Sequence, residues 1–202
     1  TGCSMDVQLM REALVSSCGF SNADVDLLAD HQATREGIVA ALENLARITE
    51  PNDVVFVHFS GQALPKRSAI YLIAHDYNSV PAESDLPGET GSRIGGGGSR
   101  GAVCATELHE FMQRIVARNK VLVLDTHPNE VFIALASQSD ASYVVLLAAS
   151  PGQLRGEVKL KQENKQVVVG LMSYVLAQAL NKFGPEVRQE QLLSWLIENV
   201  HS

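Results

Sequence analysis

The sequence predicts an α/β fold built around a mainly parallel sheet. Four short runs, residues 54–59, 69–74, 120–124 and 143–149, are nearly continuous in apolar residues, which is typical of strands covered on both faces. Segments with a helical period of apolar residues separate most of these runs. Strands that alternate with helices are typical of α/β folds. With 202 residues, the chain is long enough for one domain with a sizeable core.

The first part of the chain predicts two helices and a short strand. Residues 6–16 carry apolar side chains at helical spacing, and Gly19 suits the end of that helix. Residues 25–28 are predicted to be a short strand. Thr34 is expected to cap a second helix. The apolar face of that helix consists of Ile38, Ala41, Leu42 and Leu45.

Apolar spacing and capping residues also predict the elements after residue 60. Residues 62–68 are expected to connect two strands, and Thr106 is expected to cap an amphipathic helix over residues 108–116. A further helix is predicted near residues 129–136. The polar stretch 159–166 is predicted to be a surface loop or hairpin. Two helices are expected to close the chain, over residues 169–181 and 187–199.

Composition narrows the classes of function. The formal net charge is −7, with 23 acidic and 16 basic residues, which argues against binding to nucleic acid or to anionic membranes. No apolar run is long enough to predict a membrane span, and no signal-peptide pattern is present. Three cysteines predict reduced thiols and a cytoplasmic location rather than a disulfide framework. No metal-ligand spacing is present, so neither a metal nor a cofactor is expected.

A glycine-rich segment covers residues 89–101 and contains four consecutive glycines. Such a composition predicts a flexible, solvated loop. The alternative is a loop that cradles phosphate, which requires a strand before it and a helix directly after it. Neither requirement is met in the sequence, so the flexible loop is the preferred interpretation.

Eight short motifs follow one another along the chain. One begins Gly-Cys-Ser-Met-Asp-Val, another reads Tyr-Leu-Ile-Ala-His-Asp, and the last reads Gly-Leu-Met-Ser-Tyr. They lie at residues 2–7, 9–12, 18–20, 33–38, 52–61, 71–76, 121–125 and 170–174. In this order they resemble caspase-like cysteine peptidases (peptidase C14), nearest to the metacaspase and orthocaspase branch. The resemblance implies a caspase-like three-layer α/β/α sandwich formed by residues 1–202 as a single domain.

The resemblance also implies that both catalytic positions are substituted. In that family the first of two central strands ends in Ser-Gly-His-Gly, and the second ends in Asp-X-Cys-His. The dyad-equivalent positions here are Gln62 and His127. A glutamine cannot shuttle a proton at neutral pH, and an imidazole cannot form the thioester intermediate. A relocated dyad, for example His58 with Cys3 or Cys104, would need hydrogen-bond geometry by coincidence.

A second departure concerns a missing element. The family normally has a central strand before the position of Gly2, and this sequence contains no residues for it. A gap in a parallel sheet leaves backbone groups unpaired and apolar faces uncovered. We therefore expect that a strand upstream on the polypeptide, or one from another chain, completes the sheet.

Four further positions retain the residue types of the family's pocket for Arg or Lys side chains. In the resemblance these substrate-binding positions are Cys3, Asp6, Ser60 and Asp125. Carboxylates at such positions would pair with a buried cation. Each residue also has a structural alternative. Asp6 suits a helix N-terminus, Asp125 could cap the following helix, Ser60 suits a turn, and Cys3 suits a small core position.

Three functions remain open from the sequence. The preferred one is a catalytically inactive, caspase-like pseudopeptidase that acts by binding a basic peptide or by regulating an active homologue. The alternative is an active Arg- or Lys-directed cysteine endopeptidase, with a relocated dyad or in an inactivated form. The third is a receiver-like or nucleotide-binding domain with Asp53, Asp76 and Asp125 at its site. Asp53 precedes its strand and is therefore at the wrong edge for such a site. No sequence feature indicates an oligomeric state.

Overall fold

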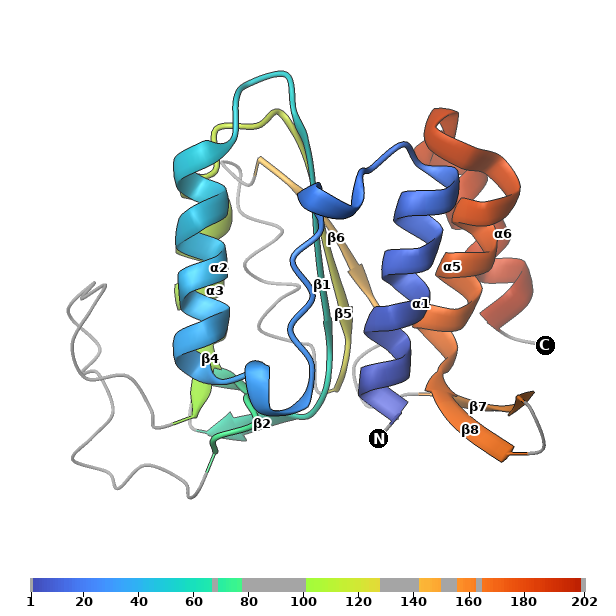
Figure 1. Ribbon diagram of the computed structural model, residues 1–202, viewed down its shortest axis with the longest axis horizontal. Helices are drawn as coiled ribbons and strands as arrows, with labels where there is room; N and C mark the ends of the chain where they lie inside the picture. The colour runs from blue at the N-terminus through green and yellow to red at the C-terminus, as the bar shows by residue number, and fades with distance from the viewer. Residues whose placement is uncertain are drawn as a thin grey trace.

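The central feature of the fold is a three-stranded parallel sheet. The computed structural model describes residues 2–66, 69–77, 101–127, 142–149, 156–162 and 165–200. In this part of the chain the sheet has the order β1–β5–β6 and lies at the centre of Figure 1. Its strands are β1 (Val54–Ser60), β5 (Asn119–Asp125) and β6 (Val144–Leu147). The strands predicted at these three positions, and their parallel arrangement, are confirmed.

Helices cover both faces of this sheet (Figure 1). On one face lie α2 (Arg35–Ile48) and α3 (Ala105–Arg114), and on the other lie α1 (Gly2–Ser17), α5 (Leu171–Phe183) and α6 (Gln189–Val200). Alternate residues of β5 supply the two cores. Leu122 and Leu124 pack with α2 and α3, whereas Val123 packs with α1 and α5. The three layers form the caspase-like α/β/α sandwich that the sequence predicts.

Local signals in the sequence set several helix limits. Thr34 caps α2 as predicted, because its hydroxyl oxygen accepts a hydrogen bond from the Gly37 amide at 3.1 Å. Gly19 follows the end of α1 and has a φ of +78°, a conformation that favours glycine. The prediction that Thr106 caps α3 is wrong. That helix begins at Ala105, directly after β4 (Ala102–Cys104), so Cys104 occupies the cap position.

Residues 25–28 do not form the predicted strand in the described structure. They follow the short 3-10 helix η1 (Asn22–Asp24) and precede η2 (Asp30–Gln32). Their backbone is extended at Val25, with φ −117° and ψ 103°, but they pair with no described strand. The prediction of a strand at residues 25–28 is therefore wrong for the described structure, in which no sheet includes them.

A small antiparallel sheet lies beside the parallel one. It has the order β2–β3–β4, with β2 at Ala63–Lys66 and β3 at Ala69–Ile73. The interpretation of residues 62–68 as a plain connection is therefore wrong for its first part. The apolar run 69–74 is a strand, but its partners are antiparallel. Its burial comes from packing in the core that α2 and α3 share.

The C-terminal part begins with an antiparallel hairpin, β7 (Glu157–Gln162) and β8 (Lys165–Gly170), which confirms the predicted hairpin. The closing helices α5 and α6 are also confirmed, and η4 (Gly184–Glu186) joins them. The helix predicted near 129–136 lies outside the described residues, as do residues 89–100 of the predicted glycine-rich loop. None of the helices that the structure describes is long and apolar enough to cross a bilayer.

Candidate functional site

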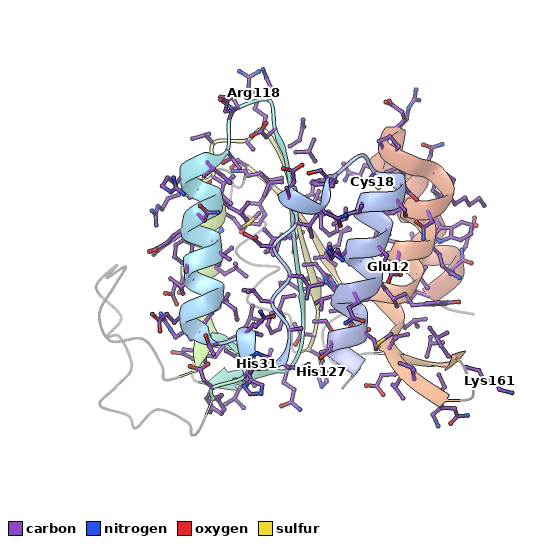
Figure 2. The ribbon with its side chains drawn as sticks, viewed as in Figure 1. Glu12, Cys18, His31, Arg118, His127 and Lys161 are labelled. Atoms are coloured by element: carbon purple, nitrogen blue, oxygen red, sulfur yellow. The ribbon has the colours of Figure 1, made fainter. Side chains whose placement is uncertain are left out.

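The carboxyl ends of β1 and β5 meet at one edge of the parallel sheet. The register pairs Ser60, the last residue of β1, with Asp125, the last residue of β5, and the Gly61 amide lies 3.4 Å from the Asp125 carbonyl oxygen. Gln62 and His127 each follow two residues after this pair, and both are exposed. Figure 2 shows His127 near the lower end of β5, and Arg118 lies near the upper end of the same strand. The two predicted dyad-equivalent positions therefore follow the tips of adjacent strands.

Asp6 joins the first turns of α1 to this edge. Its side chain is fully buried, and its Oδ2 accepts a hydrogen bond of 2.5 Å from the Ser60 hydroxyl. Its Oδ1 accepts a hydrogen bond of 2.7 Å from the backbone amide of Gly170, the residue that precedes α5. Two of the predicted substrate-binding residues, Asp6 and Ser60, are thus in direct contact.

Asp125, at the end of β5, contacts the first turn of α5. Its carboxylate is also fully buried, and one oxygen accepts hydrogen bonds from the Ser173 amide at 3.0 Å and the Ser173 hydroxyl at 2.6 Å. The Ser173 amide belongs to the first turn of α5 and needs an acceptor from outside the helix. Asp125 therefore caps α5, which begins 46 residues later in the chain, and the helix predicted directly after its strand lies outside the described residues.

His58 extends this network along β1. Its Nε2 lies 3.0 Å from the Ser173 hydroxyl oxygen. Because Ser173 uses its single hydroxyl proton on Asp125, its oxygen is the acceptor in the contact with His58. The Nε2 atom consequently carries a proton. This contact accounts for a histidine within a sheet strand, and it directs Nε2 to a hydroxyl and not to a thiol.

The network brings two carboxylates to the N-terminus of α5. Carboxylates are stabilising at this end of a helix because the first amides and the helix dipole present partial positive charge. The arrangement can therefore anchor β8 and α5 to the sheet. Cys3 lies in the first turn of α1, partly buried, and its thiol is free of any disulfide. Among the described residues, no group of His, Cys, Asp and Glu is arranged to hold a metal ion.

Sequence reasoning missed the roles of Gly170 and Ser173. Both lie in the Gly-Leu-Met-Ser-Tyr motif, which indicates the start of a helix but not the partners of its amides. A small residue at Gly170 and a hydroxyl three positions later are a weak signal of an N-terminal turn that is capped from elsewhere. The partners themselves lie 164 and 48 positions away, and no local pattern relates them.

Comparisons with known proteins agree with this geometry. A family model for the metacaspase, peptidase C14 domain matches residues 1–85, which include α1, α2 and β1. Metacaspase-7 of Arabidopsis thaliana is 38% identical over 65 residues, which are 30% of this chain and 16% of that protein. Metacaspase-1 of Plasmodium falciparum is 29% identical over 119 residues, which are 55% of this chain and 18% of that protein.

The matched segments span less than a fifth of these two curated relatives. They nevertheless agree with the order of motifs along the sequence, with the parallel sheet and with the helix layers on its two faces. The comparisons and the layered structure therefore indicate a caspase-like α/β fold, with similarity to metacaspases over part of the chain.

Proposed function

We propose that this domain is a pseudopeptidase, which keeps a caspase-like frame, does not cleave peptide bonds and acts by binding or regulation. The observation that carries the proposal is the identity of Gln62 and His127, directly beyond the paired strand ends Ser60 and Asp125. In the family resemblance these two positions hold the base and the nucleophile. Neither residue present can supply that chemistry.

The proposed partner is a basic peptide, or an active homologue that presents one. Support comes from the two buried carboxylates, Asp6 and Asp125, close to the exposed Gln62 and His127. In the present conformation both carboxylates accept hydrogen bonds from neutral donors of the protein. A cationic side chain would have to displace the Ser60 or Ser173 hydroxyl in order to pair with them. These contacts favour an anchoring role for the two carboxylates, with cation binding secondary to it.

A peptidase assay tests the absence of catalysis. The chain is mixed with fluorogenic peptides that end in Arg or Lys, and we expect no turnover above the buffer rate. The double variant Gln62→His with His127→Cys restores both residue types, and the single variant Gln62→His serves as its control because it still lacks a thiol at position 127. Turnover by the unmodified chain would overturn the proposal and support the alternative of an active Arg- or Lys-directed cysteine endopeptidase.

A titration tests the basic partner separately. Calorimetry compares a peptide that contains Arg with a matched peptide that contains Gln at the same position. A preference for the Arg peptide that disappears at high salt is expected for recognition by carboxylates. Equal affinity for the two peptides would contradict the proposed basic partner. It would not bear on the proposed absence of catalysis.

A further inference from the structure

A lysine side chain lies against two aromatic rings where α5 meets α6. Lys182 and Phe183 are the last two residues of α5, and Trp195 belongs to α6, which lies beside α5 in Figure 1. The Lys182 Nζ atom is 4.0 Å from the centroid of the Trp195 ring and 5.3 Å from that of the Phe183 ring. At these distances the negative face of a ring attracts an ammonium group. Both rings therefore contact the same cation.

Phe183 and Trp195 form a surface feature that we call the aromatic corner. Their ring planes are nearly perpendicular, with an angle of 88° and centroids 5.7 Å apart. A cation over both rings consequently lies in the angle between them, which is the position of the Lys182 ammonium group. Lys182 is exposed and the two rings are half-buried, so the aromatic corner is at the surface of the protein. Solvent and ligands reach it once the lysine side chain turns away.

The two rings are the contacts that hold the Lys182 ammonium group. Within the part of the chain that the structure describes, this group forms no hydrogen bond and no ion pair. A cation–π contact at an exposed site is weak, and a lysine ammonium is strongly hydrated. The last turn of a helix favours a lysine by charge alone, but this does not direct the side chain to a ring on another helix. A cation with a stronger preference for aromatic faces can therefore replace the lysine.

Carboxylates near the aromatic corner also favour a cationic ligand. Glu198 is three residues after Trp195 on α6, and residues at this spacing are neighbours on the surface of a helix. Glu186 is exposed on η4, which joins α5 to α6. The chain as a whole has a formal net charge of −7. These charges favour a cation over an anion as the ligand of the aromatic corner.

We propose that the aromatic corner is a binding site for methylated ammonium groups, and that Lys182 leaves it when such a group enters. Methylation keeps the positive charge, and aromatic faces recognise quaternary ammonium groups. A methylated lysine of a peptide and a small quaternary ammonium compound share this chemistry. The site is distinct from the cluster around Asp125, which contacts the N-terminal turn of α5. The 13 residues of α5 separate the two by about 18 Å, so the proposal does not depend on whether the domain cleaves peptides.

The fluorescence of Trp195 tests the proposal, because this residue is the only tryptophan in the chain. The unmodified chain is titrated at constant ionic strength with a peptide that contains trimethyllysine, with the same peptide containing unmodified lysine, and with tetramethylammonium chloride. We expect a saturable change with the trimethyllysine peptide and an affinity at least about fivefold lower for the unmodified peptide. Tighter binding of the trimethyllysine peptide than of tetramethylammonium supports a methylated lysine as the ligand. The reverse order supports a small quaternary ammonium compound.

Three variants distinguish a binding site from a purely structural contact. Lys182→Ala should raise the affinity at least about threefold, because it removes the competing ammonium group. Phe183→Leu should lower it at least about threefold, since one aromatic face is lost. The control Arg188→Ala removes an exposed positive charge just before α6 and should leave the affinity within about twofold.

The gain in Lys182→Ala is the deciding measurement, and it remains so if Phe183→Leu does not fold. A purely structural contact predicts a lower Tm for Lys182→Ala and no gain in affinity. That result would overturn the proposal, as would equal affinity for the methylated and unmodified peptides. The absence of any saturable change in the fluorescence of Trp195 would overturn it as well.

Discussion

At the residue scale, the clearest feature is the use of two buried carboxylates to hold a distant helix. Asp6 accepts from Gly170 and Asp125 accepts from Ser173, so helix α1 and strand β5 provide acceptors for the beginning of α5. Asp6 and Asp125, two of the four residues that the family resemblance assigns to a pocket, therefore have a structural task in this chain.

Removal of the Asp125 carboxylate tests this role. Asp125→Ala leaves the buried Ser173 amide and hydroxyl without their acceptor, and we expect the free energy of unfolding to fall by about 1–3 kcal/mol. Urea denaturation measures the change. The control is Asp26→Ala, because Asp26 is exposed and should tolerate the loss of its carboxylate. Equal midpoints for the two variants would contradict the capping role of Asp125.

At the element scale, a lysine joins the sheet to the end of a helix. Lys120 of β5 is buried, and its ammonium group donates to the carbonyl oxygens of Met112 and Ile115 at 2.7 Å each. A third hydrogen bond, of 2.8 Å, reaches the hydroxyl of Ser142. Burial lowers the pKa of Lys120 from its usual range. Three donors thus meet three acceptors, and the carbonyl groups at the C-terminal end of α3 are satisfied.

Replacement of this lysine should weaken the contact between α3 and the sheet. Lys120→Met keeps most of the side-chain volume but leaves two buried carbonyl groups without a donor, so we expect a loss of stability of about 1–3 kcal/mol. Amide exchange should increase most in the last turn of α3. Lys161→Met on β7 is a suitable control, since Lys161 is exposed. A uniform increase of exchange over all elements would contradict a local role.

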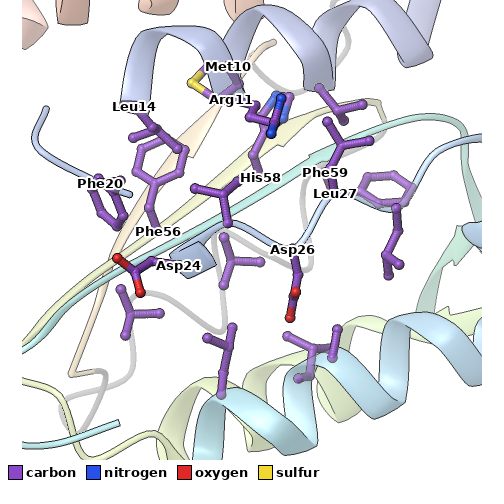
Figure 3. Close-up of a pocket in the computed structure, with 18 of the residues that line it drawn as sticks. Met10, Arg11, Leu14, Phe20, Asp24, Asp26, Leu27, Phe56, His58 and Phe59 are labelled. Atoms are coloured by element: carbon purple, nitrogen blue, oxygen red, sulfur yellow. The ribbon is translucent and has the colours of Figure 1, made fainter. Parts of the chain in front are cut away.

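At the scale of the whole molecule, two separate cores hold one sheet between helix layers. One core contains Leu42, Phe111 and Leu124, and the other contains Met10 and Leu176. Both cores depend on β5, which lies in the middle of the described parallel sheet. Among the described residues β1 is the terminal strand of this sheet, and a groove lined by α1, α2 and β1 lies beside it (Figure 3).

The stability of the whole domain should decrease at alkaline pH through Tyr143. This residue lies just before β6 and forms a hydrogen bond of 2.6 Å with His109 of α3. Burial raises the pKa of Tyr143 to about 12, above its usual value of about 10. The native state therefore keeps the phenol proton longer than the unfolded state, and the stabilisation disappears as the pH rises from about 10 to about 12.

The measurement is the free energy of unfolding of the unmodified chain and of Tyr143→Phe across this pH interval. The variant should show a smaller decrease with pH, because it has no phenol to ionise. Parallel pH profiles of the two proteins would show that Tyr143 does not couple folding to alkaline pH.

Much of the fold was predictable because the relevant signals are local. Apolar runs predicted β1, β5 and β6, helical spacing predicted most helices, and the Thr34 cap depends on a contact only three residues away. The positions of Gln62 and His127 also followed from the sequence, since both come directly after predicted strands. Local preferences of this kind require no knowledge of distant partners.

The tertiary structure alone decided which segments become neighbours. It placed β3 in an antiparallel sheet, brought Asp125 to the first turn of α5, and left residues 25–28 outside every described sheet. Burial and hydrogen bonding between residues far apart in the chain depend on how whole layers pack. A short stretch of sequence does not predict which distant residues it will contact. The sequence thus determined the elements and the residue types at the candidate site, and packing determined what those residues contact.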